Sequence, residues 1–145
     1  MDLPRALGRP GKELPAMEAL LGPFKLYLYA TLRIVAGLLF MQHGAQKLFG
    51  ALGGRQQELF SQFGLAGVVE LVGGALIAIG LFASPVAFVA SGQMAVAYFQ
   101  AHAPRAWFPI QNGGEEAALY CFLFLFIAAS GSGTLSVDAA RGGRR

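Results

Sequence analysis

The segment RIVAGLLFMQHGAQKLFG, residues 33–50, is the most informative part of this 145-residue chain. It is apolar enough for a membrane-spanning helix, yet it contains Arg33, Gln42, His43, Gln46 and Lys47. Polar groups are costly in the hydrocarbon of a bilayer, so they are retained mainly where they pair with another group or take part in function. The segment therefore predicts a membrane helix whose polar side chains meet partners elsewhere in the chain.

The composition of the whole chain also indicates a membrane protein. It is 55% hydrophobic and 13% charged, whereas about 25% of the residues in a soluble domain are charged. The net charge of +3 comes from basic residues near the chain ends rather than from a patch with interleaved aromatics, which argues against a nucleic-acid partner. Cys121 is the only cysteine, so neither an intramolecular disulfide nor a Cys-x-x-Cys redox pair can form. Electron transfer would then require a quinone, a bound cofactor or a partner protein.

Four apolar segments have lengths close to the roughly 20 residues that cross a bilayer core. They are residues 25–45, 64–83, 85–101 and 115–130, and they predict an all-α integral membrane four-helix bundle. We expect a loosely ordered polar tail over 1–23, the transmembrane domain over 24–138 and a basic tail over 139–145. Ser84 before Pro85 predicts the N-cap of the third helix, and Asn112 with Glu115 resembles a capping box at the fourth.

The distribution of basic residues predicts the orientation of the chain in the membrane. Four crossings place both termini on one side. Seven basic residues flank the terminal ends of the helices, namely Arg5, Arg9, Lys12, Lys25, Arg141, Arg144 and Arg145. Three occupy the loops on the opposite side: Lys47, Arg55 and Arg105. The positive-inside rule therefore predicts that both termini are cytoplasmic.

This topology gathers polar residues at the non-cytoplasmic ends of the helices. They are Gln42, His43, Gln46, Lys47, Glu70, Gln100, His102, Asn112, Glu115 and Glu116. The helical period also gives the first helix a face with Gly37 and Gly44, and the second a small-residue face with Gly67, Gly73 and Gly74 around Glu70. Small residues let membrane helices approach closely. If these faces meet, Glu70 is expected near Arg33 or Lys47.

Each charged residue also has a simpler structural interpretation. Glu70 with Arg33 or Lys47 can be a buried ion pair that sets the helix register. Lys47 can extend its ammonium to the membrane interface. Glu115 and Glu116 suit the N-terminus of a helix, where carboxylates are favoured.

The two histidines leave more than one interpretation open. His43 can be a hydrogen-bonding core group, a proton carrier, or a metal or haem ligand. His102 is more typical of an interfacial loop residue. A metal site made of the two histidines and the acids has no ligand-spacing motif in its favour, so no metal is expected.

Four motifs together resemble the DoxX family. They are R-x(3)-G-x(2)-F-x(2)-HG-x(2)-KLF over 33–49, E-x(2)-GG-x(2)-I-x-x-GL over 70–81, NGGE over 112–115 and GSGTLSVD over 131–138. The resemblance covers about residues 26–138 and departs from the family pattern at Ser132, where proline is typical. It implies a four-helix protein of the bacterial or archaeal plasma membrane. Relatives include a subunit of a thiosulfate:quinone oxidoreductase, and others are linked to oxidative-stress and thiol defence. The family's polar signature falls on Arg33, His43, Gly44, Lys47, Glu70, Asn112, Glu115 and Asp138.

The leading functional hypothesis is a redox-associated subunit that binds a quinone or small anion in the non-cytoplasmic half of the bundle. Glu70 and His43 would transfer protons, and Arg33 or Lys47 would hold a carbonyl or anion. The ligand-binding candidates are Arg33, Lys47, Gln93, Asn112 and Glu115, with Phe40, Phe49 and Phe63 as the apolar walls.

Two other functions stay open, and with them the question of whether the protein is an enzyme. One is a non-catalytic membrane scaffold that recruits a soluble oxidoreductase. The other is a small transporter, which is less favoured because the sequence has no inverted repeat or broken helix. The expected partners are the lipid bilayer, a soluble oxidoreductase and a second copy of the chain.

Overall fold

The computed structural model describes residues 15–142, which form helices, turns and loops without a strand. The first long segment joins α1 (Ala16–Leu21), η1 (Gly22–Phe24) and α2 (Lys25–Phe49). The second joins α3 (Gln62–Val68), η2 (Val69–Gly73) and α4 (Gly74–Ile79). The third joins α5 (Ala83–Ala97) and η3 (Tyr98–His102), and the fourth is α7 (Glu115–Ser130). Two single turns, α6 (Pro109–Asn112) and α8 (Val137–Ala140), complete this all-α fold.

The two tails expected from the sequence lie partly outside the described residues. Residues 1–14 and 143–145, with Arg5, Arg9, Lys12, Arg144 and Arg145, are not among them. The part of the first tail that is described, from Ala16 onwards, is helical and leads directly into α2.

In the described part of the chain, two continuous helical segments have the length and hydropathy to cross a membrane. They are Ala16–Phe49 and Gln62–Ile79. The outer face of α2 is apolar and exposed, with Leu28, Leu32, Val35, Leu38 and Leu39 each at least 42% accessible. A contiguous apolar surface of this kind suits contact with lipid better than contact with water.

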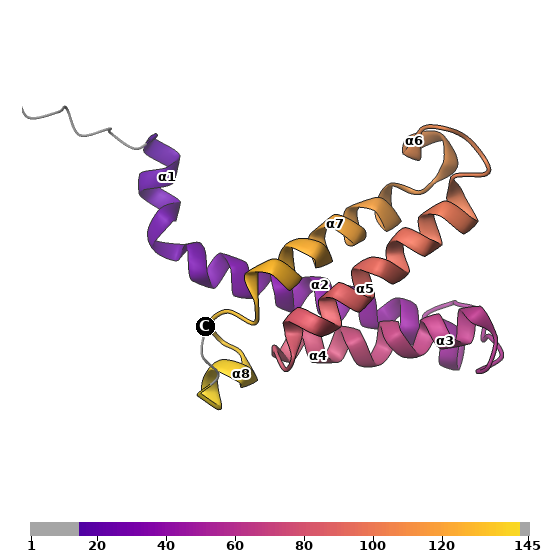
Figure 1. The fold of residues 1–145 in the computed structure, drawn as a ribbon, viewed down its shortest axis with the longest axis horizontal. Coiled ribbons are helices and arrows are strands. Elements are labelled where there is room, and N and C mark those ends of the chain that lie inside the picture. The colour runs from indigo at the N-terminus through magenta and orange to yellow at the C-terminus, as the bar shows by residue number, and fades with distance from the viewer. Residues whose placement is uncertain (1–14, 143–145) are drawn as a thin grey trace, which may run out of the picture.

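The long segments pack as two antiparallel pairs (Figure 1). In the first pair α2 lies against α3, η2 and α4, and in the second α5 lies against α7. We call the end where α2 begins and α7 ends the terminal end. The opposite end, with the connections 50–61 and 103–114, is called the loop end. The pairs lie close together where α4 leads into α5 and separate towards the loop end (Figure 1).

Glycines bring the backbones of the first pair into direct contact. A Cβ atom on Gly37 would lie 2.5 Å from the carbonyl oxygen of Gly74. A Cβ atom on Gly44 would lie 2.4 Å from the amide nitrogen of Leu71 and 2.7 Å from the carbonyl oxygen of Gly67. No larger residue fits at these positions without moving backbone. The small-residue faces predicted for both helices are therefore confirmed.

The core lies where the two pairs meet. Phe40 of α2 and Phe124 of α7 are buried, and their ring centroids are 4.7 Å apart. Ile77 of α4 and Ile127 of α7 are fully buried beside them. These large side chains join α2 to α7 even though their backbones diverge.

The helix start predicted at Ser84 is wrong. Helix α5 begins at Ala83, preceded by Phe82 in a left-handed conformation with φ 49°. The Ser84 hydroxyl instead donates to the carbonyl oxygen of Ala128 at 2.6 Å and so links α5 to α7. Capping rules consider only residues close in sequence, so they do not include the Ala128 carbonyl of the neighbouring helix.

The capping box predicted at Asn112 and Glu115 is also wrong. Helix α7 starts after Gly114, with no side-chain cap. Asn112 is the last residue of α6 and is buried. Its side chain accepts from the Gly114 amide at 2.8 Å and donates to the Ala106 carbonyl at 3.0 Å, so it holds the connection between η3 and α7 together.

Candidate functional site

A pocket of about 870 Å³ lies between the separating helix pairs at the loop end. Residues of α2, of α3 with η2, of α5 with η3 and of α7 line it. Its apolar walls include Phe40, Phe63, Val69, Met94 and Tyr120. The polar lining residues are His43, Lys47, Gln62, Glu70, Gln93, Gln100, His102, Arg105 and Glu116. A concave, mainly apolar site with a few polar groups is the usual form of a small-molecule site.

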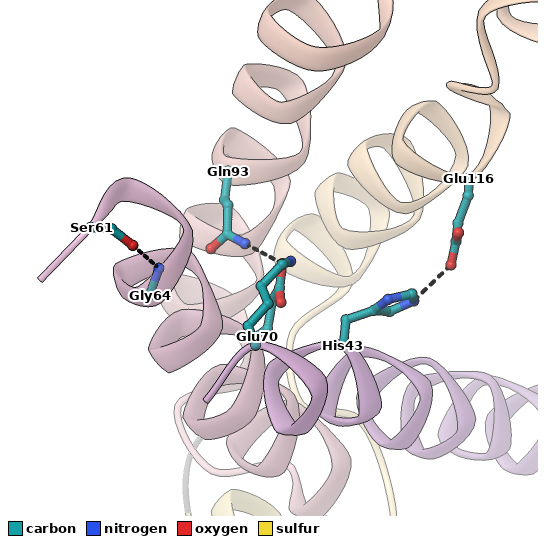
Figure 2. A network of polar contacts seen from close by, with 7 residues as sticks. His43, Ser61, Gly64, Glu70, Gln93 and Glu116 are labelled. Atoms are coloured by element: carbon teal, nitrogen blue, oxygen red, sulfur yellow. Dashed lines mark hydrogen bonds and ion pairs between the residues drawn. The ribbon is translucent and has the colours of Figure 1, made fainter. Parts of the chain in front are cut away.

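The carboxylate of Glu70 is the centre of the polar network. It is 1% exposed, and its Oε1 atom accepts from the Lys47 ammonium and, at 2.8 Å, from the Gln93 amide. Figure 2 shows that Glu70 and Gln93 come from two different helical segments and point towards one another. Among the described residues, Oε2 of Glu70 and Oε1 of Gln93 are buried without a hydrogen-bond partner. The network thus keeps two acceptors available to a donor from outside the chain.

Two π-helical turns shape this pocket. Glu70 lies in η2, and Gln100 and His102 lie in η3. A π turn inserts an extra residue into an α-helix, which rotates the side chains that follow, and such turns occur frequently at functional sites. The second and third long segments each contain one at the level of the pocket.

A second polar pair bridges the two helix pairs at the pocket. His43 Nε2 on α2 lies 2.8 Å from Glu116 Oε1 on α7, and Figure 2 shows this contact beside the Glu70 network. Both side chains are accessible, at 38% and 62%. The His43 ring also stands edge-on to Tyr120. This pair connects the buried part of the pocket with its exposed rim.

Arg33 has a different environment. It is fully buried, and its guanidinium donates to the carbonyl oxygens of Ile77 at 2.5 Å, Ala78 at 2.7 Å and Leu135 at 2.9 Å. Ile77 and Ala78 are near the C-terminus of α4, where a positive charge is favoured by the helix dipole. Of the two partners predicted for Glu70, Lys47 is therefore confirmed and Arg33 is wrong.

Comparison with known proteins identifies the family. The model of the DoxX family matches residues 28–103. This chain belongs to the DoxX family. An uncharacterized protein of Haemophilus influenzae (strain ATCC 51907 / DSM 11121 / KW20 / Rd) is 39% identical over 122 residues, which cover 79% of this chain and 91% of that protein. No solved structure matches. Together with the apolar helices, the family membership makes this chain a helical membrane protein.

The DoxX fold brings some of the site residues predicted from sequence together. His43, Lys47, Glu70 and Gln93 all line the pocket, whereas Arg33, Asn112 and Glu115 do not. The Nη1 and Nη2 atoms of Arg33 and the side-chain amide of Asn112 are hydrogen-bonded to backbone groups of their own chain, whereas Nε of Arg33 is buried without a partner among the described residues. Of the predicted apolar walls, Phe40 and Phe63 line the pocket, and Phe49 is an exposed residue outside it.

Two lining residues on α7 of this DoxX chain were missed as site residues. The sequence places Glu116 among the polar residues at the non-cytoplasmic ends and favours a role at the helix N-terminus, and it does not single out Tyr120. They are four residues apart and so share one helix face. That spacing is the signal that points both of them, rather than Glu115, towards α2. Within residues 15–142 no cluster of three His, Cys, Asp or Glu side chains suited to a metal ion occurs.

Proposed function

We propose that this DoxX protein is a redox-associated membrane subunit that binds the ring of a quinone or quinol in the loop-end pocket. The observation that carries the proposal is the buried Glu70 carboxylate beside a largely apolar cavity of about 870 Å³, because its Oε2 atom has no hydrogen-bond partner within residues 15–142. A buried acceptor without a donor is costly. A quinol hydroxyl would supply that donor, and Phe63 and Tyr120 offer aromatic surface for the ring.

The charges of the pocket favour a quinone over a small anion. The positive charge of Lys47 is neutralised by Glu70, and His43 is already paired with Glu116. In the buried part of the pocket an anion would have to displace one of these carboxylates, and the remaining cation of the lining, Arg105, is exposed in the connection beyond η3. The hydroxyl groups of a neutral quinol need only hydrogen-bond acceptors, which Glu70 Oε2 and Gln93 Oε1 can provide.

The same residues suit proton transfer. Oxidation of a quinol releases two protons and two electrons. Glu70 would accept a proton from the hydroxyl that it binds, and the accessible pair of His43 and Glu116 would pass protons to water at the rim. The electrons would go to a soluble oxidoreductase partner, and the reverse steps would reduce a quinone. If no quinone binds, the protein is better described as a scaffold for that partner.

Glu70→Gln is expected to weaken the binding of a short-chain ubiquinol at least about tenfold, because a charge-assisted hydrogen bond contributes about 1.5–3 kcal/mol. Titration of the purified full-length protein in nanodiscs, with intrinsic fluorescence as the readout, measures this change. Glu115→Gln is the matched control, because Glu115 is an exposed carboxylate outside the pocket. Ala97→Phe, which fills the cavity without altering its charges, should also weaken binding.

The proposal fails if Glu70→Gln and Ala97→Phe both bind the quinol as tightly as the wild type. A thermal unfolding curve of each variant separates loss of binding from loss of the fold. Unchanged quinol turnover in membranes carrying Glu70→Gln or His43→Ala would remove these residues from the proton path while leaving the binding site in place.

We propose further that the chain crosses the plasma membrane four times with both termini in the cytoplasm. The exposed rings of Tyr27 at the terminal end and Trp107 at the loop end support the crossing, since such rings gather at both membrane interfaces. The larger number of basic residues near the chain ends supports the orientation. In a Cys121→Ala background, a membrane-impermeant maleimide should label Gln56→Cys in intact cells and Ala140→Cys only after lysis. Labelling of Ala140→Cys in intact cells would reverse the orientation.

A further inference from the structure

A second cavity, of about 1130 Å³, lies at the terminal end, away from the pocket described above. Its lining comes from the start of α2, the turn into α5, the end of α7 and the segment that contains α8. The apolar lining residues include Leu28, Leu32, Phe82 and Phe126. None of its lining residues is shared with the loop-end pocket.

Polar and apolar residues are separated along this cavity. Lys25 is the first residue of α2, and Leu28 and Leu32 follow it on the same helix face. At 1.5 Å per residue they lie about 4.5 Å and 10 Å deeper. Leu28 and Leu32 are 50% and 42% exposed, so their side chains are open to a hydrocarbon ligand. The site thus has a charged rim and an apolar interior, as an amphiphile requires.

The charge available at the rim is positive. Lys25 and Arg141 line the cavity, and neither makes an ion pair with another described residue. The only acid in the lining, Asp138, accepts from the Ser132 hydroxyl at 2.5 Å. The carbonyl oxygen of Gly131 is occupied as well, by the Tyr29 hydroxyl at 2.6 Å. The Asp138 carboxylate keeps its negative charge, so two cations and one carboxylate leave the rim with a net positive charge.

We propose that this cavity binds one anionic phospholipid from the leaflet that meets the terminal end. Its phosphate lies between Lys25 and Arg141, and its acyl chains lie along Leu28, Leu32 and Phe126. Basic pockets between membrane helices bind anionic head groups in this way. A zwitterionic lipid offers the same hydrocarbon but less negative charge to the two cations. This site is independent of the quinone proposal.

The test uses the full-length protein in detergent with fluorescent phosphatidylglycerol and phosphatidylcholine as probes. Phosphatidylglycerol should bind at about one molecule per chain and more tightly than phosphatidylcholine. The double variant Lys25→Gln/Arg141→Gln should bind phosphatidylglycerol about 30-fold more weakly, since each basic residue near a membrane surface contributes about fivefold in affinity. Arg55→Gln, an exposed change at the loop end, should leave binding unaltered. Leu32→Trp, which narrows the apolar part of the cavity, should weaken the binding of both lipids.

Three results would overturn the proposal. The first is equal binding of the two lipids, and the second is binding that the double variant leaves unchanged; either identifies general annular lipid. The third is displacement of phosphatidylglycerol by inorganic phosphate at equal concentration, because the apolar part of the cavity would then contribute nothing. Quinol binding in the double variant should match the wild type, which separates this test from that of the loop-end pocket.

Discussion

Gly44→Ala is expected to lower the free energy of unfolding by about 3 kcal/mol, at the upper end of the usual cost of overpacking. The added Cβ would lie 2.4 Å from the Leu71 amide nitrogen and 2.7 Å from the Gly67 carbonyl oxygen. Both neighbours are backbone atoms, so no side chain can rotate away. Helix α2 must instead move from η2, which also separates Lys47 from Glu70. Quinol binding should therefore fall together with stability.

Gly92→Ala provides the matched control. Gly92 also lies inside a helix, α5, but a Cβ there meets nothing within 4 Å. Alanine is favoured over glycine in a helix interior by about 1 kcal/mol, so this variant should be as stable as the wild type or more so. Thermal unfolding of both variants in the same detergent measures the difference. Equal melting temperatures for the two would contradict the close backbone contact between α2 and η2.

Arg33→Met is the second change with a large expected effect, and it should lower the free energy of unfolding by about 3 kcal/mol. It removes the guanidinium that donates to the carbonyls of Ile77, Ala78 and Leu135. The Ile77 carbonyl keeps the Gly80 amide as a donor at 3.1 Å, but a buried acceptor left without a donor costs about 1–3 kcal/mol. The bond to Leu135 also ties the C-terminal segment to α2. We expect a lower melting temperature and faster proteolysis after residue 131. Quinol affinity per folded molecule should change little, because Arg33 lies outside the pocket.

Arg33→Lys should restore only part of that loss. A lysine keeps the charge near the end of α4 but presents a single ammonium in place of a planar fork. It cannot reach both the α4 carbonyls and Leu135 in the geometry of the guanidinium. Arg55→Met is the control, since Arg55 is exposed. Wild-type stability and protease resistance in Arg33→Met would show that these three hydrogen bonds contribute little.

Much of the first helix pair could be predicted from sequence, because its determinants are local. Gly37 and Gly44 fall on one face of α2 by the helical period, and Gly67 and Gly74 do the same on the second segment. Once these faces meet, Lys47 and Glu70 are within reach of each other. The helical period and the small size of these residues therefore predict the contact between the two helices before the fold is known.

The partners of Arg33 and Asn112 could not be predicted in this way. Both bind backbone carbonyls, and a carbonyl has no signature in the sequence. Leu135 is 102 positions from Arg33 along the chain, so only the return of the C-terminal segment to α2 and α4 brings them together. Likewise, no residue pattern in the sequence predicts the π turns that contain Glu70 and His102.

The amino-acid sequence alone determined that this is a helical DoxX membrane protein and that its polar residues gather at one end, because hydropathy and periodicity are properties of each segment. The tertiary structure decided which of those residues share a site. The two helix pairs separate at the loop end, and the pocket between them is lined by His43, Glu70 and Gln93. The same packing places Arg33 against carbonyls elsewhere, because the direction of a side chain in a bundle depends on how its helices cross.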